Sequence, residues 1–379
     1  MNVLISGGAG FIGSNLALRL VELGHQVTVL DNLSAQVHGP KADEHSYLYQ
    51  RIRNKVSFIY GDVTKREDWE KCLEGQQVVV HLAAETGTGQ SMYKITHYTS
   101  VNMLGTAELL DILTNKRGHS IRKVLIASSR AVYGEGKYET EEGRVVYPNA
   151  RKKEDLDCGR FEIQGEEPDQ KLKPVATDEL SKVHPTSVYG LTKLFQEQLV
   201  TTVCPTIGVM PVVMRYQNVY GPGQSLQNPY TGILSIFSSL IRQGKTINIF
   251  EDGLESRDFV YIDDVVEATI RAITCDEAIG GIFNVGAGIP TTVLEVAKAL
   301  MHHYDREVKL HISGNYRLGD IRHNFADITR IGAALGYKPS VMFSEGVGRF
   351  VDWVKGQNIT ENNYESSLTE MADRGLLKQ

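Results

Sequence analysis

The sequence predicts an α/β fold: a doubly wound parallel sheet followed by a smaller, mixed α/β lobe. Short apolar runs with strand character alternate with helical patterns through residues 1–215. A glycine-rich turn joins the first strand directly to the first helix, and an acidic residue ends the second strand. From residue 216 onward the strand–helix alternation weakens, which indicates that a second lobe begins there.

The first motif is a strand, a turn and a helix in immediate succession. The apolar run Asn2–Ser6 leads into Gly7–Gly13 (GGAGFIG), and Ser14–Leu23 follows with leucines at helical spacing. Glycines allow a tight turn and a close approach to a pyrophosphate, while the helix N-terminus offers free N–H groups. A flexible loop would explain the glycines alone. Their position between a strand and a helix instead favours the opening βαβ unit of a Rossmann-type fold.

The second strand points to the identity of the dinucleotide. Gln26–Leu30 ends in Asp31, whose carboxylate suits the ribose hydroxyls of NAD and would repel the 2′-phosphate of NADP. We therefore expect NAD as the cofactor. Further contacts are expected where the later strands end, with Asn102 acting through a water. The predicted cofactor-binding residues are Gly7, Gly10, Phe11, Ile12, Gly13, Asp31, Asn32, Asp62, Val63, Leu82, Ala83, Ala84, Asn102, Tyr189 and Lys193.

Four more strands are expected in the first domain, at Val56–Val63, Gln77–Ala84, Lys123–Ala127 and Pro211–Tyr216. Ligands of open α/β sheets bind at the carboxyl ends of such strands. His81 lies near the end of one of them and has two interpretations, a catalytic base or a hydrogen-bonded core histidine. Its apolar strand favours the core histidine.

The remaining chain divides into three parts. Residues 134–182 are polar and lack periodicity, which is compatible with a functional lid or with a surface excursion. Residues 1–215 otherwise form the expected NAD-binding domain. Residues 216–355 form the expected substrate lobe, with some elements returning to the first domain, and residues 356–379 form a tail polar enough to fray.

Composition excludes several classes of protein. A net charge of −6 without a basic block argues against nucleic acid, and no apolar run approaches the roughly 20 residues that span a bilayer. The chain enters a strand at once, so we expect no signal peptide. Cys72, Cys158, Cys204 and Cys275 are scattered without a CxxC pair, which argues against zinc and disulfides. We therefore expect a cytoplasmic protein without a bound metal.

Tyr189 and Lys193 form the predicted chemical centre. They are four residues apart on an amphipathic helix and so lie on one face. A free tyrosine has a pKa near 10, and a nearby ammonium group stabilises its phenolate at neutral pH. Tyr189 would then accept a hydroxyl proton while Ser129, at the end of a strand, hydrogen-bonds the same oxygen. A chance YxxxK on a surface helix is the alternative, but the glycine turn, Asp31 and Ser129 together disfavour it.

These residues resemble the extended short-chain dehydrogenase/reductases that act on nucleotide sugars. The resemblance covers residues 1 to about 355, and it is carried by Gly7–Gly13, Tyr189-x-x-x-Lys193, Arg215–Asn218, Arg257–Val260 and Arg317–Asp320. It implies catalytic residues Ser129, Tyr189 and Lys193, a nucleotide-sugar substrate and a homodimer. Arg257 and Arg317 would neutralise the diphosphate, a task suited to guanidinium groups. The implied substrate-binding residues are Thr86, Ser129, Arg130, Asn218, Arg257, Arg317 and Asp320.

The two residues after Ser129 distinguish subfamilies. Dehydratases of this family carry Asp-Glu there and decarboxylases carry a Glu at the second position, whereas this chain has Arg130-Ala131. The resemblance therefore implies a 4-epimerase, which oxidises C4 and returns the hydride to the other face. Segments Ser129–Gly136, Asn218–Leu226 and Asn228–Gly232 are most similar to those of dTDP-L-rhamnose 4-epimerases. Epimerases of UDP-hexoses or UDP-hexuronates, and 4-keto-sugar reductases, stay open as alternatives.

Overall fold

The centre of the computed structural model, which describes residues 1–116, 118–165, 170–226, 228, 232–275, 281–357 and 364–378, is a seven-stranded parallel sheet. Its strand order is β13-β9-β5-β4-β1-β2-β3. Six of the seven strands come from the predicted first domain, so the predicted doubly wound fold is confirmed. The strands are β1 (Asn2–Ser6), β2 (Gln26–Asp31), β3 (Ser57–Tyr60), β4 (Val78–His81), β5 (Lys123–Ser129), β9 (Met210–Tyr216) and β13 (Ile282–Val285).

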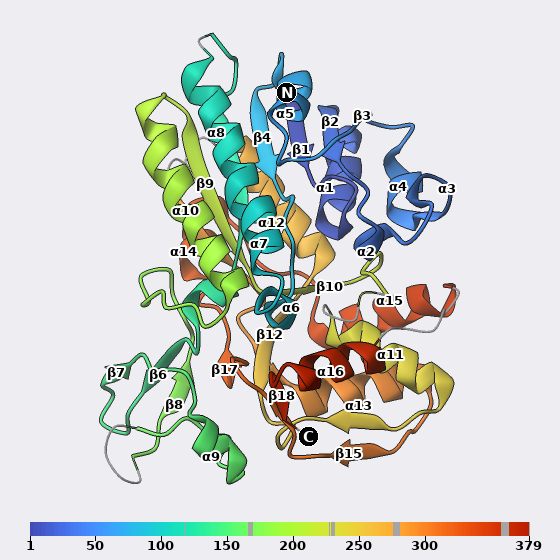
Figure 1. Cartoon of the computed structure of the whole chain (residues 1–379), viewed down its shortest axis with the longest axis vertical. Coiled ribbons are helices and arrows are strands. Elements are labelled where there is room, and N and C mark those ends of the chain that lie inside the picture. Colours follow the sequence, from blue (N-terminus) through green and yellow to red (C-terminus); the bar gives the residue numbers. More distant parts are fainter. Residues whose placement is uncertain are drawn as a thin grey trace.

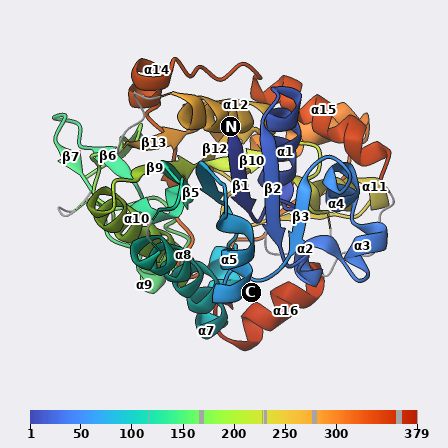
Figure 2. The same ribbon diagram turned by 90° about the horizontal axis from the view of Figure 1, so that it is seen from above.

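Helices cover both faces of this sheet (Figure 2). Helix α1 (Phe11–Glu22) packs beside α12 (Ile262–Thr274) on one face, and it buries Leu16 and Leu20. The opposite face carries α5 (Arg66–Leu73), α8 (Gly105–Asn115) and α10 (Val188–Thr206). The strand order reverses between β1 and β4, and a ligand site is expected above their carboxyl ends.

Shorter helices connect these elements. Residues 32–55, expected to hold a loop and a surface helix, form α2 (Ala35–His38), α3 (Ala42–His45) and α4 (Tyr47–Ile52). The stretch before α8 contains α6 (Thr88–Ser91), α7 (Ile95–Tyr98) and the π-helical turn η1 (Thr99–Leu104), and β5 runs into the 3-10 turn η2 (Arg130–Tyr133).

The second lobe lies below the carboxyl edge of the sheet (Figure 1). Two elements encoded within it lie in the first domain, where β13 joins the large sheet and α12 packs beside α1. The other elements are β10 (Asn218–Tyr220), α11 (Ile233–Gln243), β11 (Ile247–Ile249), β12 (Ser256–Tyr261), β14 (Pro290–Thr292), α13 (Val293–Tyr304), β15 (Leu310–Ile312), β16 (Tyr316–Arg317), β17 (His323–Asn324), α14 (Thr329–Leu335) and α15 (Phe343–Lys355).

Residues 134–182 form a small subdomain that projects from the lower part of the molecule (Figure 1). An antiparallel sheet, β7-β6-β8, consists of Lys137–Glu139 (β6), Val145–Val146 (β7) and Lys173–Val175 (β8), and α9 covers Lys153–Asp157. Strands of two or three residues are too short to produce an alternating pattern, which explains why the sequence showed no periodicity here.

The expectation that the polar tail frays is wrong for its described part. Residues 364–378 form α16 (Tyr364–Asp373) and β18 (Leu377–Lys378), which pairs antiparallel with β16. Tyr364, Ser367 and Met371 are buried, and their spacing places them on one helix face. Among the helices that the structure describes, none is both long and apolar enough to cross a membrane.

Candidate active site

A cavity of about 590 Å³ lies at the carboxyl ends of the sheet strands and extends into the second lobe. The topology explains its position, because β1, β4, β5 and β9 all end there. With the exception of Asn102, every residue that the sequence assigned to the cofactor or the substrate lines this one cavity. Residues far apart in the sequence, such as Asp31 and Arg317, thus share a continuous wall.

The glycine turn is built so that side chains are excluded. Gly7 has φ +68°, and a Cβ added there would lie 2.6 Å from the Ala83 nitrogen. A Cβ on Gly13 would lie 2.4 Å from the Gly7 carbonyl oxygen. Gly10 occupies the N-cap of α1 and offers no side-chain acceptor, so the N–H groups of the first turn face the cavity end without a capping side chain. This arrangement fits the pyrophosphate of a dinucleotide.

Asp31 is buried at the end of β2. Its carboxylate accepts hydrogen bonds from the backbone nitrogens of Ala9 (2.9 Å) and Leu33 (2.8 Å). Burial raises the pKa of Asp31, and these hydrogen bonds and the imidazole of His38, 3.9 Å away, act against that rise. His38 also lines the cavity, although sequence analysis did not single it out because it lies in a polar stretch.

Asp62 and Asn32 form the neighbouring wall. The Asp62 carboxylate accepts hydrogen bonds from the Thr64 nitrogen and hydroxyl at 2.9 and 2.8 Å, and Asn32 donates to it at 3.3 Å. These bonds fix the orientation of the Asp62 side chain in the cavity wall.

Ser129, Tyr189 and Lys193 meet at the opposite end of the cofactor wall. The Lys193 ammonium group lies 5.9 Å from the centre of the Tyr189 ring and donates a hydrogen bond to the Ala127 carbonyl oxygen at 2.8 Å. Burial lowers the pKa of Lys193 to about 7. Burial also raises the pKa of Tyr189, while a hydrogen bond with Ser129 lowers it.

Arg130 adds a positive charge at this point. Its guanidinium lowers the pKa of Tyr189, and its Nε donates to the Asn218 Oδ1 at 2.8 Å. Burial, aided by Arg257, lowers the pKa of Arg130 itself to about 9. Sequence analysis assigned Arg130 to the substrate only. The geometry also makes it an electrostatic neighbour of Tyr189.

Asn102 is the correction among the predicted site residues, because its side chain does not line the cavity. It is fully buried, accepts from the Glu85 nitrogen at 2.8 Å, and donates to the Glu85 oxygen and the Thr192 hydroxyl. It therefore ties the cavity loop at Glu85 to α10 rather than contacting the cofactor.

His81 is a core histidine, as the sequence favoured. Its two ring nitrogens lie 2.6 Å from the Ser6 hydroxyl and 2.9 Å from the Thr106 hydroxyl. Burial lowers its pKa to about 3, so the ring is neutral at physiological pH.

The far end of the cavity carries the two arginines assigned to the diphosphate. Arg257 donates to the backbone oxygens of Ile321 (2.6 Å) and Arg322 (2.9 Å). The guanidinium carbon of Arg317 lies 4.9 Å above the Phe250 ring, and Asp320 is 4.0 Å from the same guanidinium. These contacts within the protein hold both arginine side chains in place.

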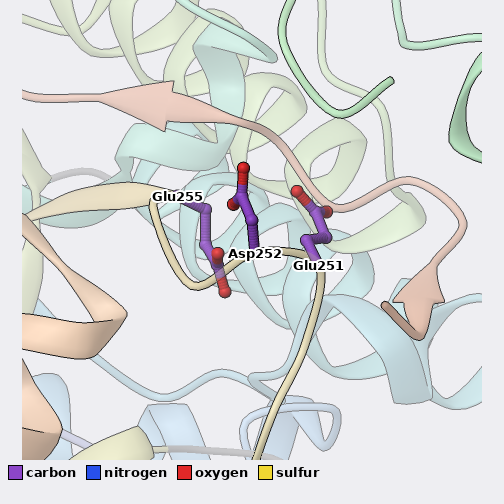
Figure 3. Close-up of side chains that lie close together, drawn as sticks. All are labelled: Glu251, Asp252 and Glu255. Carbon is purple, nitrogen blue, oxygen red and sulfur yellow. The ribbon is translucent and has the colours of Figure 1, made fainter. Parts of the chain in front are cut away.

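Three carboxylates, Glu251, Asp252 and Glu255, lie close enough together to hold a metal ion (Figure 3). Two arginines already neutralise them. Arg322 donates to Glu251 at 2.9 Å and to Asp252 at 2.8 and 2.9 Å, and Arg151 pairs with Glu251 at 2.8 Å. The cluster is therefore an ion-pair network between the second lobe and the 134–182 subdomain.

Several cavity residues escaped sequence analysis. Phe250 directly follows β11, and its aromatic ring was the available signal. Gln217 and Gln224 lie within motifs that were attributed to the family. Tyr364 lies in the tail that was expected to fray. All four line the cavity.

The fold and the cavity define a dinucleotide-binding α/β enzyme whose ligand site lies at the reversal point of its sheet. The model of the NAD dependent epimerase/dehydratase family matches residues 3–151 and 162–286, and the chain belongs to this family. The predicted class, an NAD-dependent enzyme of the nucleotide-sugar epimerase type, is confirmed.

Characterised relatives span almost the whole chain. A dTDP-L-rhamnose 4-epimerase of Burkholderia thailandensis is 36% identical over 93% of this chain and 94% of its own length. A UDP-glucose 4-epimerase of Mycolicibacterium smegmatis is 30% identical over 94% of this chain and 100% of its own length. Among solved structures, the UDP-glucuronic acid 4-epimerase of Bacillus cereus, in complex with UDP-glucuronic acid and NAD, gives a TM-score of 0.75. It is 26% identical, covering 94% of this chain and 99% of the other.

Proposed function

We propose that the protein is a nucleotide-sugar 4-epimerase that converts dTDP-L-rhamnose to dTDP-6-deoxy-L-talose. The observation that carries the reaction type is the grouping of Ser129, Tyr189 and Lys193 in one cavity with Arg130 beside them. Arg130-Ala131 stands where an eliminating enzyme needs a carboxylate pair, so neither dehydration nor decarboxylation has its acid or base.

The residues have distinct parts in the proposed reaction. Tyr189 accepts the proton of the C4 hydroxyl, Ser129 hydrogen-bonds the same oxygen, and Arg130 favours the phenolate form of Tyr189. Lys193 is placed on the cofactor side through its bond to the Ala127 carbonyl. NAD, held by the glycine turn and Asp31, would supply the hydride acceptor for C4 and the hydride donor for the reverse step. Arg257 and Arg317 anchor the diphosphate while the sugar turns between the two half-reactions.

The identity of the sugar is supported by the 36% identical relative, against 30% for a UDP-glucose 4-epimerase. Five residues of one resembling segment line the same cavity, which supports this assignment: Asn218, Val219, Tyr220, Gln224 and Ser225. Within the resembling segment Asn228–Gly232, Pro229, Tyr230 and Thr231 lie outside the described residues. A UDP-hexose or UDP-hexuronate is the alternative substrate, because relatives with those activities also span the chain.

The deciding experiment incubates the protein, without added cofactor, with dTDP-L-rhamnose, UDP-glucose, UDP-N-acetylglucosamine and UDP-glucuronate separately. Proton NMR of each mixture reports the configuration at C4. We expect conversion of dTDP-L-rhamnose. Conversion of a UDP sugar alone would refute dTDP-L-rhamnose as the substrate but would still support a 4-epimerase reaction. A 4-keto-sugar reductase would instead consume NADH in step with product, and a sensor protein would bind NAD without turnover.

Two further properties belong to this proposal. We propose a homodimer, whose interface is considered below. We also propose a reducing, cytoplasmic setting, since Cys72, Cys158, Cys204 and Cys275 are all free thiols.

A further inference from the structure

The C-terminal segment Tyr364–Lys378 connects the two walls of the cavity. At one end, β18 pairs with β16, placing Leu377 opposite Arg317 of the second lobe. On the other side, the Tyr93 hydroxyl of the first domain donates to Glu370 of α16 at 3.0 Å. Arg374 lies 4.3 Å above the Tyr93 ring, so α16 meets this tyrosine through two different interactions.

Apolar packing reinforces the same contact. Met371 is buried, and a Cβ added to Gly89 of α6 would lie only 3.1 Å from its sulfur. Since Thr88 of α6 lines the cavity, the segment is packed directly behind the cavity wall of the first domain. Figure 1 shows α16 crossing the second lobe below α6. A polar segment thus bridges two lobes at the point where their walls approach each other.

Tyr364 brings this segment into the cavity itself. It is 8% exposed and lines the cavity together with Arg317, Phe250 and Asp320. Burial raises the pKa of Tyr364, and a hydrogen bond with the Arg317 guanidinium lowers it. The Arg317 guanidinium thus lies over the Phe250 ring and also interacts with Tyr364.

We propose that Tyr364–Lys378 is a strap that closes the nucleotide end of the cavity, with Tyr364 positioning Arg317 for the diphosphate of the ligand. The proposal rests on the proposed function to the extent that the ligand carries a diphosphate. An arginine side chain has several rotatable bonds, and fixing it beforehand reduces the ordering cost on binding. Because the strap joins both lobes, it must loosen at Tyr93 whenever a nucleotide sugar enters or leaves.

If the strap positions Arg317, its removal should weaken substrate binding without slowing the chemical step. Tyr364→Phe removes a hydroxyl next to Arg317, and Tyr93→Phe removes the anchor to Glu370. Each substitution removes a single hydroxyl and leaves Ser91, which accepts a hydrogen bond from the Tyr189 nitrogen at 3.0 Å, unchanged. The bond-making groups therefore stay in place. We expect each variant to raise KM for the nucleotide sugar about fivefold, the usual effect of one hydrogen bond, with kcat and NAD content unchanged. Thr369→Ala, exposed on the same helix, and Tyr60→Phe, exposed on the edge strand β3, are the matched controls.

A measurement without turnover tests the strap independently of the reaction. Amide hydrogen exchange of residues 364–378 is followed in the NAD-loaded protein with and without dTDP, and separately with UDP. We expect the bound diphosphate to slow exchange across the strap in the wild type and to do so less in Tyr364→Phe. Unchanged exchange on saturation with both nucleotides, or an unchanged KM in both tyrosine variants, would overturn the proposal. Absence of epimerase activity in the wild type would count against the proposed function alone, because the exchange measurement does not depend on it.

Discussion

Tyr189 illustrates how neighbouring groups determine the chemistry of a side chain. Buried alone, its phenol would be a weaker acid than a free tyrosine, because burial disfavours the phenolate, and less of the phenolate base would be present at neutral pH. Ser129 and Arg130 act in the opposite direction and lower its pKa. Lys193, one helical turn away, is directed at the Ala127 carbonyl instead. The positive charge next to Tyr189 therefore comes in large part from a residue outside the YxxxK motif.

Replacing this tyrosine tests the assignment directly. Tyr189→Phe keeps the ring and removes the acid–base group, so we expect turnover to fall by roughly 10²- to 10⁴-fold. NAD released by denaturing the variant should match the wild-type amount, because the cofactor cradle is built from other elements. Tyr60→Phe, an exposed tyrosine, is the control. Normal turnover in Tyr189→Phe would contradict the catalytic role.

Residues within motifs were predictable from the sequence, whereas residues that depend on tertiary contacts were not. Gly7, Gly13 and Asp31 follow from a local strand–turn–helix pattern, and they line the cavity. Asn102 was assigned to the cofactor because it lies on a helix close to the site, but that helix turns its amide toward Glu85 and Thr192. Tyr364 belongs to the segment that ends in β18, and β18 pairs with β16, where Leu377 lies opposite Arg317. This pairing between distant parts of the chain brings Tyr364 to the cavity.

At the scale of elements, His81 links three parts of the first domain. It lies on β4 and contacts Ser6 of β1 and Thr106 of α8 through its two ring nitrogens. Its pKa of about 3 in the folded protein is far below 6.5, the usual value. Between these values the unfolded chain binds more protons, so the stability that neutral His81 contributes is lost as pH falls below 6.5.

This linkage gives a pH-dependent prediction. At pH 4.5 the loss attributable to His81 is about 3 kcal/mol of unfolding free energy relative to pH 7. His81→Asn should be less stable than the wild type at pH 7 yet lose about 3 kcal/mol less between pH 7 and 4.5. Denaturant unfolding at both pH values measures this, with His302→Asn, at an exposed site, as the control. Identical losses in the wild type and His81→Asn would show that His81 does not stay neutral.

The 134–182 subdomain is attached to the second lobe through Arg322. This side chain is fully buried and also contacts Glu162 of the subdomain. None of the described residues in the subdomain lines the cavity, so the structure shows no lid over the ligand site. The sequence left lid and surface excursion open because ion pairs between distant segments leave no local pattern.

Removing the guanidinium of Arg322 should lower the unfolding free energy of the protein. Arg322→Met removes the guanidinium that holds Asp252 and leaves Glu251 with Arg151 alone, and breaking a buried pair in this way costs about 3–5 kcal/mol of unfolding free energy. Arg160→Met removes an exposed ion pair with Asp155, formed at 2.7 Å, and should cost less than about 1 kcal/mol. Chemical denaturation of both variants supplies the comparison. Equal and small losses of unfolding free energy in Arg322→Met and Arg160→Met would mean that solvent screens the ion pairs of Arg322.

On the scale of the whole molecule, the fold concentrates ligand chemistry at one edge and leaves an apolar area elsewhere. The strand order was accessible from the sequence in outline, because alternating strands and helices imply a parallel sheet. The position of β13 next to β9 could not be predicted from the sequence, because it requires the chain to return from the second lobe to the first-domain sheet. The outer surface of α7, η1 and α10 exposes Ile95, Leu104 and Leu191 by 52%, 45% and 55%. We call these three residues the helical apolar face.

The helical apolar face is the surface on which we place the proposed homodimer. Helices α10 and α8 lie side by side in both views (Figures 1 and 2), and α10 packs against η1 and α7, so the three residues lie on neighbouring elements. In a twofold dimer each substitution occurs twice at the interface. Burial of one leucine is worth roughly 1.5–3 kcal/mol, and a glutamate in its place adds the cost of an unpaired charge.

We therefore expect Leu191→Glu to weaken dimerisation at least 100-fold, since two leucines are lost and 1.4 kcal/mol corresponds to about tenfold. Light scattering coupled to size-exclusion chromatography should give a dimer mass for the wild type and a monomer mass for Leu191→Glu at micromolar concentration. Leu180→Glu is the matched control, because Leu180 is 90% exposed but lies in the 134–182 subdomain, away from the helical apolar face. A dimer that persists in Leu191→Glu and dissociates in Leu180→Glu would move the interface to the subdomain. A monomeric wild type would refute the dimer itself.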